Sequence, residues 1–401
     1  MKLSTPHLDN KDYDYVKKVI NTGWISTSSL YVKSFEKEIS KISGTKYAVA
    51  TNSGTSAIHL ALMAMGVNEN CEVIVPSITF IATVNPILYL KAKPIILDVD
   101  EQYNLKIKDV LNFIKEKTVF KNNITINKKT KKVLKVIVVA HMWGRPCDFI
   151  KLKKICQKKN IYILEDAAEA LGSYIKFNNS KKYYHCGSIG DVGCLSFNAN
   201  KIITTGSGGA LITNNKNIYK KSEYLASQAK DDSFNYIHND CGYNYKMNGI
   251  SAGLGISQIK KLKNKISKRK NIFNRYIYNF KHCKEIRILN ISINSKINYW
   301  INVIYFKKLN YKKVEKLSFF LNKKKIETRR VWRPLNLQKY LKKFETFNIK
   351  DSERLYHKSL CLPSDDTLSN KNIDKICSYI INFYENITTH KQKTQSSLGG
   401  N

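Results

Sequence analysis

Short apolar runs alternate with amphipathic stretches along the first part of the chain. The apolar runs are rich in β-branched residues and span Tyr47–Thr51, Glu72–Pro76, Lys93–Asp98, Leu134–Ala140 and Ile161–Glu165. Helical periodicity is clearest at Asp9–Ile20, Ser34–Ile42 and Ala57–Met65. Apolar strands separated by helices are typical of a parallel sheet with crossover helices. The pattern therefore predicts an α/β fold built around a central, mostly parallel sheet.

The longest charge-free stretch, Val73–Leu90, is at the lower limit of length for a membrane span. Pro76 and Pro86 break it, and several hydroxyl and amide side chains interrupt it. A short strand, a loop and the start of a helix fit this stretch better than a membrane helix, so we expect no membrane insertion.

The second part of the chain has a different pattern. A Lys-rich helix is predicted over Ile259–Phe280, followed by strand character at Tyr299–Phe306 and a helix at Tyr311–Asn322. We therefore expect a large domain over residues 1–258, with a basic hairpin inserted near 116–133, and a smaller α+β domain over 259–385. The polar segment 386–401 ends in Ser-Ser-Leu-Gly-Gly-Asn and is predicted to be a disordered tail.

The composition is strongly basic, which raises the question of an anionic partner. The 401 residues carry 68 Lys+Arg against 31 Asp+Glu, a formal net charge of +37. Such an excess can indicate nucleic acid, an anionic membrane or a phosphorylated substrate. Because the lysines are spread along the whole chain without a block of five, we interpret the charge mainly as a property of overall composition.

The nine cysteines form no CxxC pair and no Cys/His cluster with zinc spacing, so no metal site is predicted. The N-terminal residues lack the apolar region of a secretory signal. Both features suit free thiols in a reducing cytoplasm.

Three local features point to one cofactor. Ser53-Gly54-Thr55 leaves a strand and opens a helix, as in a phosphate cradle, because the first amides of a helix lack internal partners. Asp166 ends a second apolar strand among small residues, and Lys201 follows a third strand before a Gly-rich turn. A desolvated lysine is what Schiff-base chemistry requires. Phosphate cradle, partner for a pyridinium nitrogen and lysine together predict a site for pyridoxal 5'-phosphate (PLP).

The same motifs carry a resemblance over residues 4 to 385. The chain resembles the DegT/StrS family of PLP-dependent nucleotide-sugar aminotransferases through Ser53–Leu60, Pro76–Phe80, Glu165–Gly172, Gly190–Gly193, Ser196–Gly209 and Gly242–Asn248. Its segments Thr22–Ser26, 116–133, Ser227–Tyr245 and Thr328–Asn336 are similar to the LegC-type subgroup. The resemblance implies the large-domain and small-domain architecture of fold-type I PLP aminotransferases, with PLP held by residues 1–258.

The resemblance also implies a role for each matching residue. Lys201 matches the Schiff-base lysine and acid/base, and Asp166 the carboxylate that keeps the pyridine nitrogen protonated. The other positions that match cofactor-binding residues are Phe80 for ring stacking, Gly54, Thr55 and Ser196 for the phosphate, and Glu169 beside the phenolic oxygen. Asn244 matches a residue that reaches the neighbouring subunit's cofactor, so a homodimer with shared active sites is implied.

Other positions depart from the family pattern or are less specific. Glu169 stands where many members have Gln, Ser207 replaces an acidic residue, and Lys246 replaces an Arg. For the sugar nucleotide, the candidate residues are Gly23, Trp24, Ile25, Ser26, His185, Arg329 and Trp332. A structural His185 and a solvated basic loop at Arg329 are equally good interpretations. His141, in a strand-end loop, is a further candidate of the same kind.

The implied activity is transamination of a nucleotide-linked 4-keto-6-deoxy sugar with L-glutamate as amino donor, for surface-glycan biosynthesis. UDP-4-keto-6-deoxy-N-acetylhexosamine is the expected substrate, and a GDP- or dTDP-linked keto sugar of the perosamine or 3-amino type is the alternative. A related dehydratase would carry His in place of Lys201. A non-catalytic nucleic-acid-binding or regulatory protein would not need the Asp166/Lys201 pair.

Overall fold

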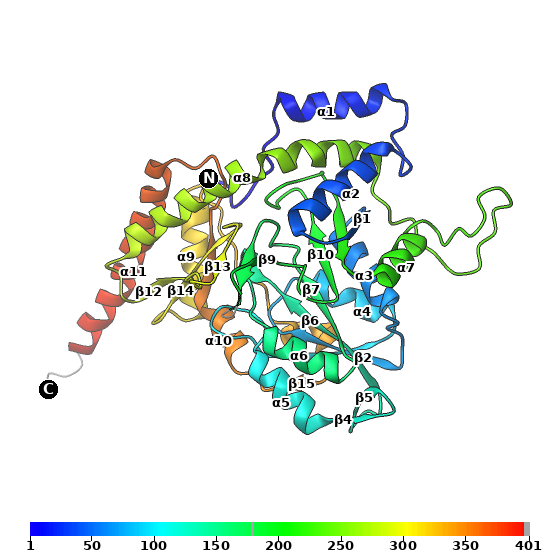
Figure 1. Cartoon of the computed structure of the whole chain (residues 1–401). Coiled ribbons are helices and arrows are strands. Elements are labelled where there is room, and N and C mark those ends of the chain that lie inside the picture. The colour runs from blue at the N-terminus through cyan, green and yellow to red at the C-terminus, as the bar shows by residue number, and fades with distance from the viewer. Residues whose placement is uncertain (178–179, 397–401) are drawn as a thin grey trace.

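The computed structural model describes residues 1–177 and 180–396, and the side chains of this part as far as residue 387. A ten-stranded mixed sheet forms its centre, in the order β1-β11-β10-β7-β6-β2-β3-β15, with the β4–β5 hairpin attached to β6 (Figure 1). The strands are β1 (Tyr47–Thr51), β2 (Cys71–Pro76), β3 (Lys93–Leu97), β4 (Thr118–Lys121), β5 (Ile124–Asn127), β6 (Val133–Ala140), β7 (Tyr162–Asp166), β10 (Val192–Ser196), β11 (Gly209–Thr213) and β15 (Thr346–Phe347).

The middle of this sheet is parallel, as the sequence predicted. Strands β10, β7, β6, β2, β3 and β15 pair in parallel, whereas β11 runs antiparallel to both β10 and β1. The basic hairpin expected near 116–133 is present as β4–β5. The charge-free stretch after residue 73 forms the end of β2, the short 3-10 helix η1 (Ile81–Thr83) and α4 (Asn85–Tyr89). Within the described residues no helix is both long and apolar enough to cross a bilayer.

Alternate side chains of the strands bury on opposite faces of the sheet, because side chains in a strand have a period of two. Val73 and Val75 of β2 pack with α3 (Gly54–Ala64), α4 and α7 (Lys216–Ala226). Ile74, between them, packs on the other face with α5 (Ile107–Lys117) and α6 (Ile150–Lys158). Helices therefore cover both faces, as Figure 1 shows.

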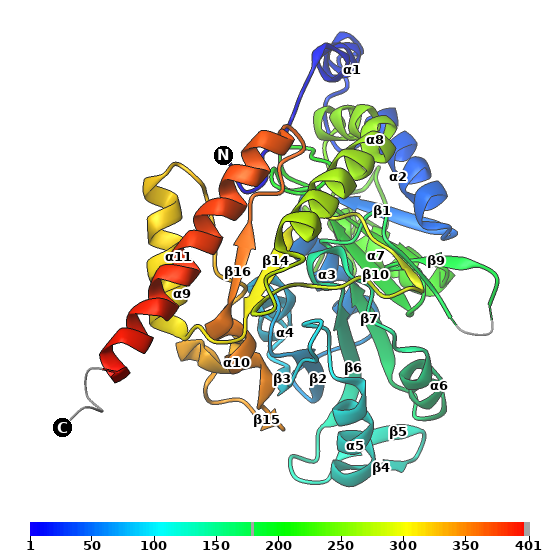
Figure 2. The same ribbon diagram turned by 90° about the vertical axis from the view of Figure 1, so that its left-hand side faces the viewer.

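The second part of the chain begins with a helix longer than predicted. Helix α8 runs from Gly249 to Phe280 and lies against α1 (Asn10–Asn21) and α2 (Leu30–Ser43) in its first half (Figure 2). It starts ten residues before the expected Ile259 and crosses the expected boundary at 258/259, because Asn248 caps its first turn. The division of the chain into domains at this residue stays a prediction.

Beyond α8, three strands and two helices enclose a separate core. The sheet order is β12-β14-β16, from β12 (Ile286–Ile288), β14 (Asn302–Phe306) and β16 (Ser359–Leu362). Helices α9 (Tyr311–Lys323) and α11 (Asn370–Ser396) pack on it with the end of α8. The remaining elements are β8 (Tyr174–Lys176), β9 (Tyr183–His185), η2 (Met142–Gly144), β13 (Ser295–Lys296), η3 (Leu335–Leu337), η4 (Lys339–Leu341) and α10 (Asp351–Lys358).

The expected disordered tail from Asn386 is corrected for its first part. Helix α11 continues to Ser396, and Ile387, one helical turn beyond Phe383, packs with it against the core of this second unit. Residues 397–401 lie outside the described residues.

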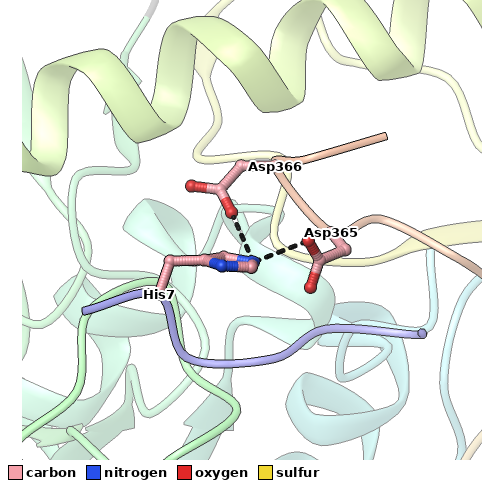
Figure 3. Close-up of side chains that lie close together, drawn as sticks. All are labelled: His7, Asp365 and Asp366. Carbon is pink, nitrogen blue, oxygen red and sulfur yellow. Dashed lines mark hydrogen bonds and ion pairs between the residues drawn. The ribbon is translucent and has the colours of Figure 1, made fainter. Parts of the chain in front are cut away.

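The N-terminal arm is attached to the second unit by a cluster of charged side chains (Figure 3). His7 Nε2 lies 2.7 Å from Asp365 Oδ1 and 3.2 Å from Asp366 Oδ1. The amide of Thr5 donates to Asp365 Oδ2 at 2.8 Å, and the Thr5 hydroxyl contacts the same oxygen. Lys265 Nζ lies 3.8 Å from Asp366 Oδ2, so this carboxylate already has a cationic partner. We interpret this cluster as a structural clasp rather than a metal site.

Asp365 makes the clasp dependent on pH. Burial opposes its ionisation, but hydrogen bonds from Thr367, Thr5 and His7 outweigh burial and hold the pKa of its carboxyl well below the usual range. A carboxyl with a lowered folded-state pKa stabilises the fold above its unfolded-state pKa of about 4 and loses this contribution as the pH falls further. We expect Asp365→Asn to lower the free energy of unfolding at pH 7 by about 1–3 kcal/mol.

The difference in Tm between wild type and Asp365→Asn should shrink below about pH 4, measured by thermal denaturation at a series of pH values. Asp366→Asn is the matched control and should have the smaller effect at pH 7, because the ion pairs of Asp366 are longer. A Tm difference for Asp365→Asn that is constant with pH would contradict this account.

Candidate active site

The ends of β1, β7 and β10 and the start of α3 converge on a cavity of about 270 Å³. These strands end at the same edge of the sheet, where open α/β sheets place their ligands. Lys201, Asp166 and Ser53 come from three separate segments of the chain and all line this cavity. The three features singled out in the sequence therefore meet in one place.

Lys201 lies deep in the cavity, with its side chain only 13% exposed. Its Nζ is 4.1 Å from the centre of the Trp300 ring and 3.8 Å from Glu169 Oε1. Burial lowers the pKa of Lys201, although the carboxylates of Glu169 and Asp166 oppose the shift. The larger effect of burial increases the unprotonated fraction of this amine, which is the form that acts as a nucleophile or base.

Glu169 is held on two sides. The amide of Trp143 donates to Glu169 Oε2 at 2.6 Å, and the Trp332 indole N–H donates to Glu169 Oε1 at 3.2 Å. Burial raises the pKa of Glu169, and Lys201 opposes that shift. This carboxyl is therefore fixed beside the amine and its charge is coupled to that of Lys201.

Asp166 presents its carboxylate at the floor of the cavity. The Thr83 hydroxyl donates to Asp166 Oδ2 at 2.6 Å, and the amide of Ala168 donates to Oδ1 at 3.1 Å. These two donors fix the orientation of the carboxylate. A protonated ring nitrogen above it would have a ready counter-ion.

The start of α3 forms a close-packed cradle opposite Ser196. Ser53 caps the helix and accepts a hydrogen bond from the Ser56 amide. A Cβ added at Gly54 would lie 3.0 Å from Ser196 Cβ, and one at Gly209 would lie 2.5 Å from the Ser53 carbonyl carbon and oxygen. Glycine at both positions lets the helix terminus, with its free amides and positive dipole, lie directly against the end of β10.

Comparison with known proteins decides the family. Residues 6–381 match the DegT/DnrJ/EryC1/StrS aminotransferase family. GDP-perosamine synthase of Escherichia coli O157:H7 is 33% identical over 94% of this chain and 97% of its own length. UDP-4-amino-4,6-dideoxy-N-acetyl-beta-L-altrosamine transaminase of Campylobacter jejuni is 32% identical over 68% of each chain. A Streptococcus pneumoniae protein solved in its PLP form superposes with a TM-score of 0.85, at 24% identity over 96% of this chain and 99% of the other.

The chain belongs to the DegT/DnrJ/EryC1/StrS aminotransferase family. It is a sugar aminotransferase with the PLP-dependent fold, and pyridoxal phosphate is its cofactor.

The cavity of this aminotransferase fits PLP by the chemistry of its donors. The amides of Gly54 and Thr55 with the Ser196 hydroxyl suit the phosphate, and Asp166 suits the ring nitrogen. Phe80 forms one wall, with its ring centre 5.1 Å from that of Trp332. Lys201 lines the cavity with its Nζ 3.8 Å from Oε1 of Glu169, the residue expected beside the phenolic oxygen of the cofactor. All these predicted cofactor residues line the same cavity.

The expected substrate residues divide into two groups. Trp332 lines the cavity and contacts Glu169. Gly23, Trp24, Ile25 and Ser26 form the α1–α2 loop, whose Trp24 is 66% exposed and which does not line the cavity. Asn244 is also exposed and outside it, and its carbonyl accepts a hydrogen bond from the Asn52 side chain at 3.2 Å.

His185 and Arg329 do not reach the cavity. His185 is buried, and its Nε2 accepts a hydrogen bond from the Gly172 amide at 2.9 Å. Burial lowers the pKa of His185 to about 4, so it is neutral and structural at pH 7. Arg329 is exposed and pairs with Glu327 at 3.1 Å. That these two side chains touch the sugar therefore stays a prediction, which the geometry of a single chain does not support.

The two remaining departures and one further histidine also find structural partners. Ser207 lines the cavity, and its hydroxyl donates to the Asn52 carbonyl at 2.7 Å. Lys246 lies between Glu36 and Glu223, 3.4 Å from each, and away from the cavity. His141 lines the cavity edge, and its Nδ1 accepts from the Cys147 amide while Nε2 donates to Glu165 at 2.8 Å.

Sequence reasoning missed Trp300 and Thr83. Trp300 lies 99 positions after Lys201 and was expected only as part of a strand, so no local signal joins the two. Thr83 was interpreted as an interruption of an apolar run. The signal that could have indicated it is the pair of hydroxyl residues Thr79 and Thr83, four positions apart in the stretch that follows β2, whose hydroxyls lie 2.7 Å apart.

The coupling between Glu169 and Lys201 can be measured on the amine itself. Because anionic Glu169 stabilises the Lys201 ammonium, Glu169→Gln should lower the pKa of Lys201. The pH dependence of Lys201 acetylation by acetic anhydride in the PLP-free protein, followed by peptide mass spectrometry, reports this pKa. Its midpoint should move to lower pH in the variant.

Glu223→Gln is the matched control, since Glu223 pairs with Lys246 rather than with Lys201. Equal midpoints in wild type and Glu169→Gln would show that the two groups are not coupled.

Proposed function

We propose that this aminotransferase transfers the amino group of L-glutamate to C4 of a nucleotide-linked 4-keto-6-deoxy sugar, with UDP-4-keto-6-deoxy-N-acetylhexosamine as substrate. The observation that carries the chemistry is the desolvated Lys201 amine in the same cavity as the oriented Asp166 carboxylate. PLP, when bound, supplies a conjugated cationic ring that takes up the electron pair left when a C–H bond next to nitrogen is broken. The protein must then position that bond, move the proton and keep the ring nitrogen charged.

Lys201 moves the proton. Its free Nζ would accept the proton from the α-carbon of the amino donor and pass it to the bound cofactor, and in the second half-reaction it would carry a proton in the reverse direction, from the cofactor to C4 of the sugar. The Trp300 ring packs against Nζ at 4.1 Å and shields one side of the amine from water. Glu169, at 3.8 Å, steadies the ammonium between the two transfers. Within each half-reaction the amine takes up one proton and gives one up, so it returns to its starting protonation state.

Asp166 keeps the opposite end of the site negative. Its two hydrogen bonds, from Thr83 and Ala168, orient the carboxylate, and a carboxylate beside the ring nitrogen favours the protonated form of that nitrogen. The cradle of Gly54, Thr55 and Ser196 anchors the phosphate end and sets the distance between ring and Lys201. Phe80 and Trp332 are placed to cover the ring and to border the sugar.

The relatives support the C4 position and leave two nucleotides as candidates. The Campylobacter jejuni relative is named for a UDP-linked 4-amino-4,6-dideoxy sugar, whose precursor has a ketone at C4. The subgroup resemblance of Thr22–Ser26 and of the β4–β5 hairpin region supports the UDP-linked substrate. GDP-perosamine synthase, at 33% identity over 94% of this chain, supports the GDP-linked precursor of perosamine as a second candidate.

We also propose a homodimer whose active sites are completed across the interface. Several large apolar side chains are exposed on the α1–α2 region and on the loop before α8, which Figure 1 shows projecting from the body: Trp24 at 66%, Leu30 at 78%, Phe234 at 89% and Tyr236 at 75%. A second copy covering them would bury this surface. The exposed Asn244 and the 23–26 loop, both outside the cavity of one chain, would then be available to the partner's site.

The activity test is amino transfer from L-glutamate to each keto-sugar nucleotide, measured as 2-oxoglutarate and as the mass of the amino-sugar product. We expect turnover with the UDP-linked sugar and a loss of at least about 100-fold in Lys201→Ala, because general acid/base catalysis is removed. Lys216→Ala, at an exposed position of α7, is the control and should keep the wild-type rate.

A higher kcat/KM for the GDP-linked sugar would replace the first substrate by the second candidate. Retention of amino transfer in Lys201→Ala, or no 2-oxoglutarate with either sugar, would contradict the mechanism.

A further inference from the structure

A separate cavity, of about 180 Å³, is lined in part by the loop that follows β6. Its lining shares no residue with that of the active site within the described chain. The lining residues are Gln102, Asn104, Arg145, Pro146, Asn290, Ile291, Ser292, Ser295 and Ile297. Arg145 is the single charged residue in this set.

Arg145 is a buried cation without a counter-ion in the described part of the chain. It is 4% exposed, and its Nη2 donates to the Leu289 carbonyl at 3.0 Å. Its Nε and Nη1 have no hydrogen-bond partner among the residues that the structure describes. Burial lowers the pKa of Arg145 to about 10, so the guanidinium stays charged at pH 7. Tyr103, Tyr299 and Cys361 are the groups that act on it, and all three are neutral at this pH.

An isolated buried charge is strongly unfavourable unless an opposite charge or hydrogen bonds compensate it. The rest of the cavity offers donors. Within the described residues Ser295 Oγ is buried without a hydrogen-bond partner. Ser292 Oγ accepts from the Asn294 amide, which leaves its proton free to donate. The described lining holds no carboxylate, so no negative charge there would repel an anion, and the cavity suits one.

We propose that the Arg145 cavity binds a small inorganic anion, a halide or an oxyanion, which pairs with the guanidinium. Its volume holds such an ion with a few waters, since one water takes about 30 Å³ of the liquid. The Arg145 side chain and the hydroxyls of Ser292 and Ser295 are its ligands. This inference is independent of which sugar the enzyme aminates.

The site is connected to the active centre through one short segment. Residues 141–145 carry His141 and Met142, which line the active-site cavity, and Trp143, whose amide holds Glu169 at 2.6 Å. Arg145 is two residues further. An anion bound to Arg145 fixes the end of this segment and thereby the position of Glu169 beside Lys201.

The test measures the Tm of the PLP-loaded protein as chloride or phosphate replaces gluconate at constant ionic strength. Gluconate, a bulky organic anion with a single carboxylate, serves as the reference anion. We expect a saturable rise in Tm of about 2–5 °C with chloride, phosphate or both, because a ligand that binds only the folded state stabilises it. Which of the two salts acts identifies the anion as halide or oxyanion.

Arg145→Gln should abolish the saturable rise. Arg287→Gln is the matched control, because Arg287 is partly exposed and already paired with Glu101 at 2.9 Å, and it should keep the rise. If Arg145→Gln does not fold, Ser295→Ala takes its place and should weaken the apparent anion affinity several-fold. A rise that is linear in salt, is equal in Arg145→Gln and wild type, or is unchanged in affinity in Ser295→Ala would overturn the proposal and leave a water-filled cavity.

Discussion

Enclosure of the Lys201 amine is the constraint on which the rest of the site depends. An amine in water near neutral pH is protonated and cannot accept a proton, so the protein must make the charged form less favourable. Burial does this, and Trp300 supplies one wall of the enclosure from beyond α8. Trp332, which binds Glu169, comes from the same part of the chain. The site is therefore complete only when the two parts of the chain pack against each other.

Two adjacent carboxylates at the end of β7 show how the sheet divides structural from chemical roles. Because neighbouring side chains of a strand point to opposite faces, Glu165 and Asp166 enter different environments. Glu165 is fully buried and accepts hydrogen bonds from His141 and from the amides of Gly187, Ile189 and Gly190. These donors outweigh burial and lower its pKa, so it serves as a buried anchor. Asp166 faces the cavity and is left for the cofactor.

Much of the fold and the centre of the site could be predicted because their signals are local. The strand Tyr47–Thr51 was predicted to the residue, and the ends of β2, β3, β6 and β7 within one residue, since apolar β-branched runs mark them. Lys201, Asp166 and Gly54 each follow a strand and meet because strand ends share an edge. Trp300 could not be found this way, because its contact with Lys201 depends on how the second unit docks. The start of α8 was missed because its first turns, Gly249–Gly255, are poor helix formers held by the Asn248 cap and by packing on α1 and α2.

Several residues expected to bind the sugar nucleotide lie outside the cavity of a single chain, and their positions bear on how the enzyme selects its substrate. His185 and Arg329 have structural partners within one chain and lie outside the cavity. Under the proposed function, the cofactor ring and phosphate would occupy much of a cavity of about 270 Å³, and the nucleotide would extend outward past Phe80 and Trp332. The exposed apolar side chains of the α1–α2 loop and of the loop before α8 lie outside the cavity, as does Asn244. If a second copy covers this surface, the choice between UDP and GDP depends on residues contributed at the interface, whereas the amino-transfer chemistry depends on residues within each chain.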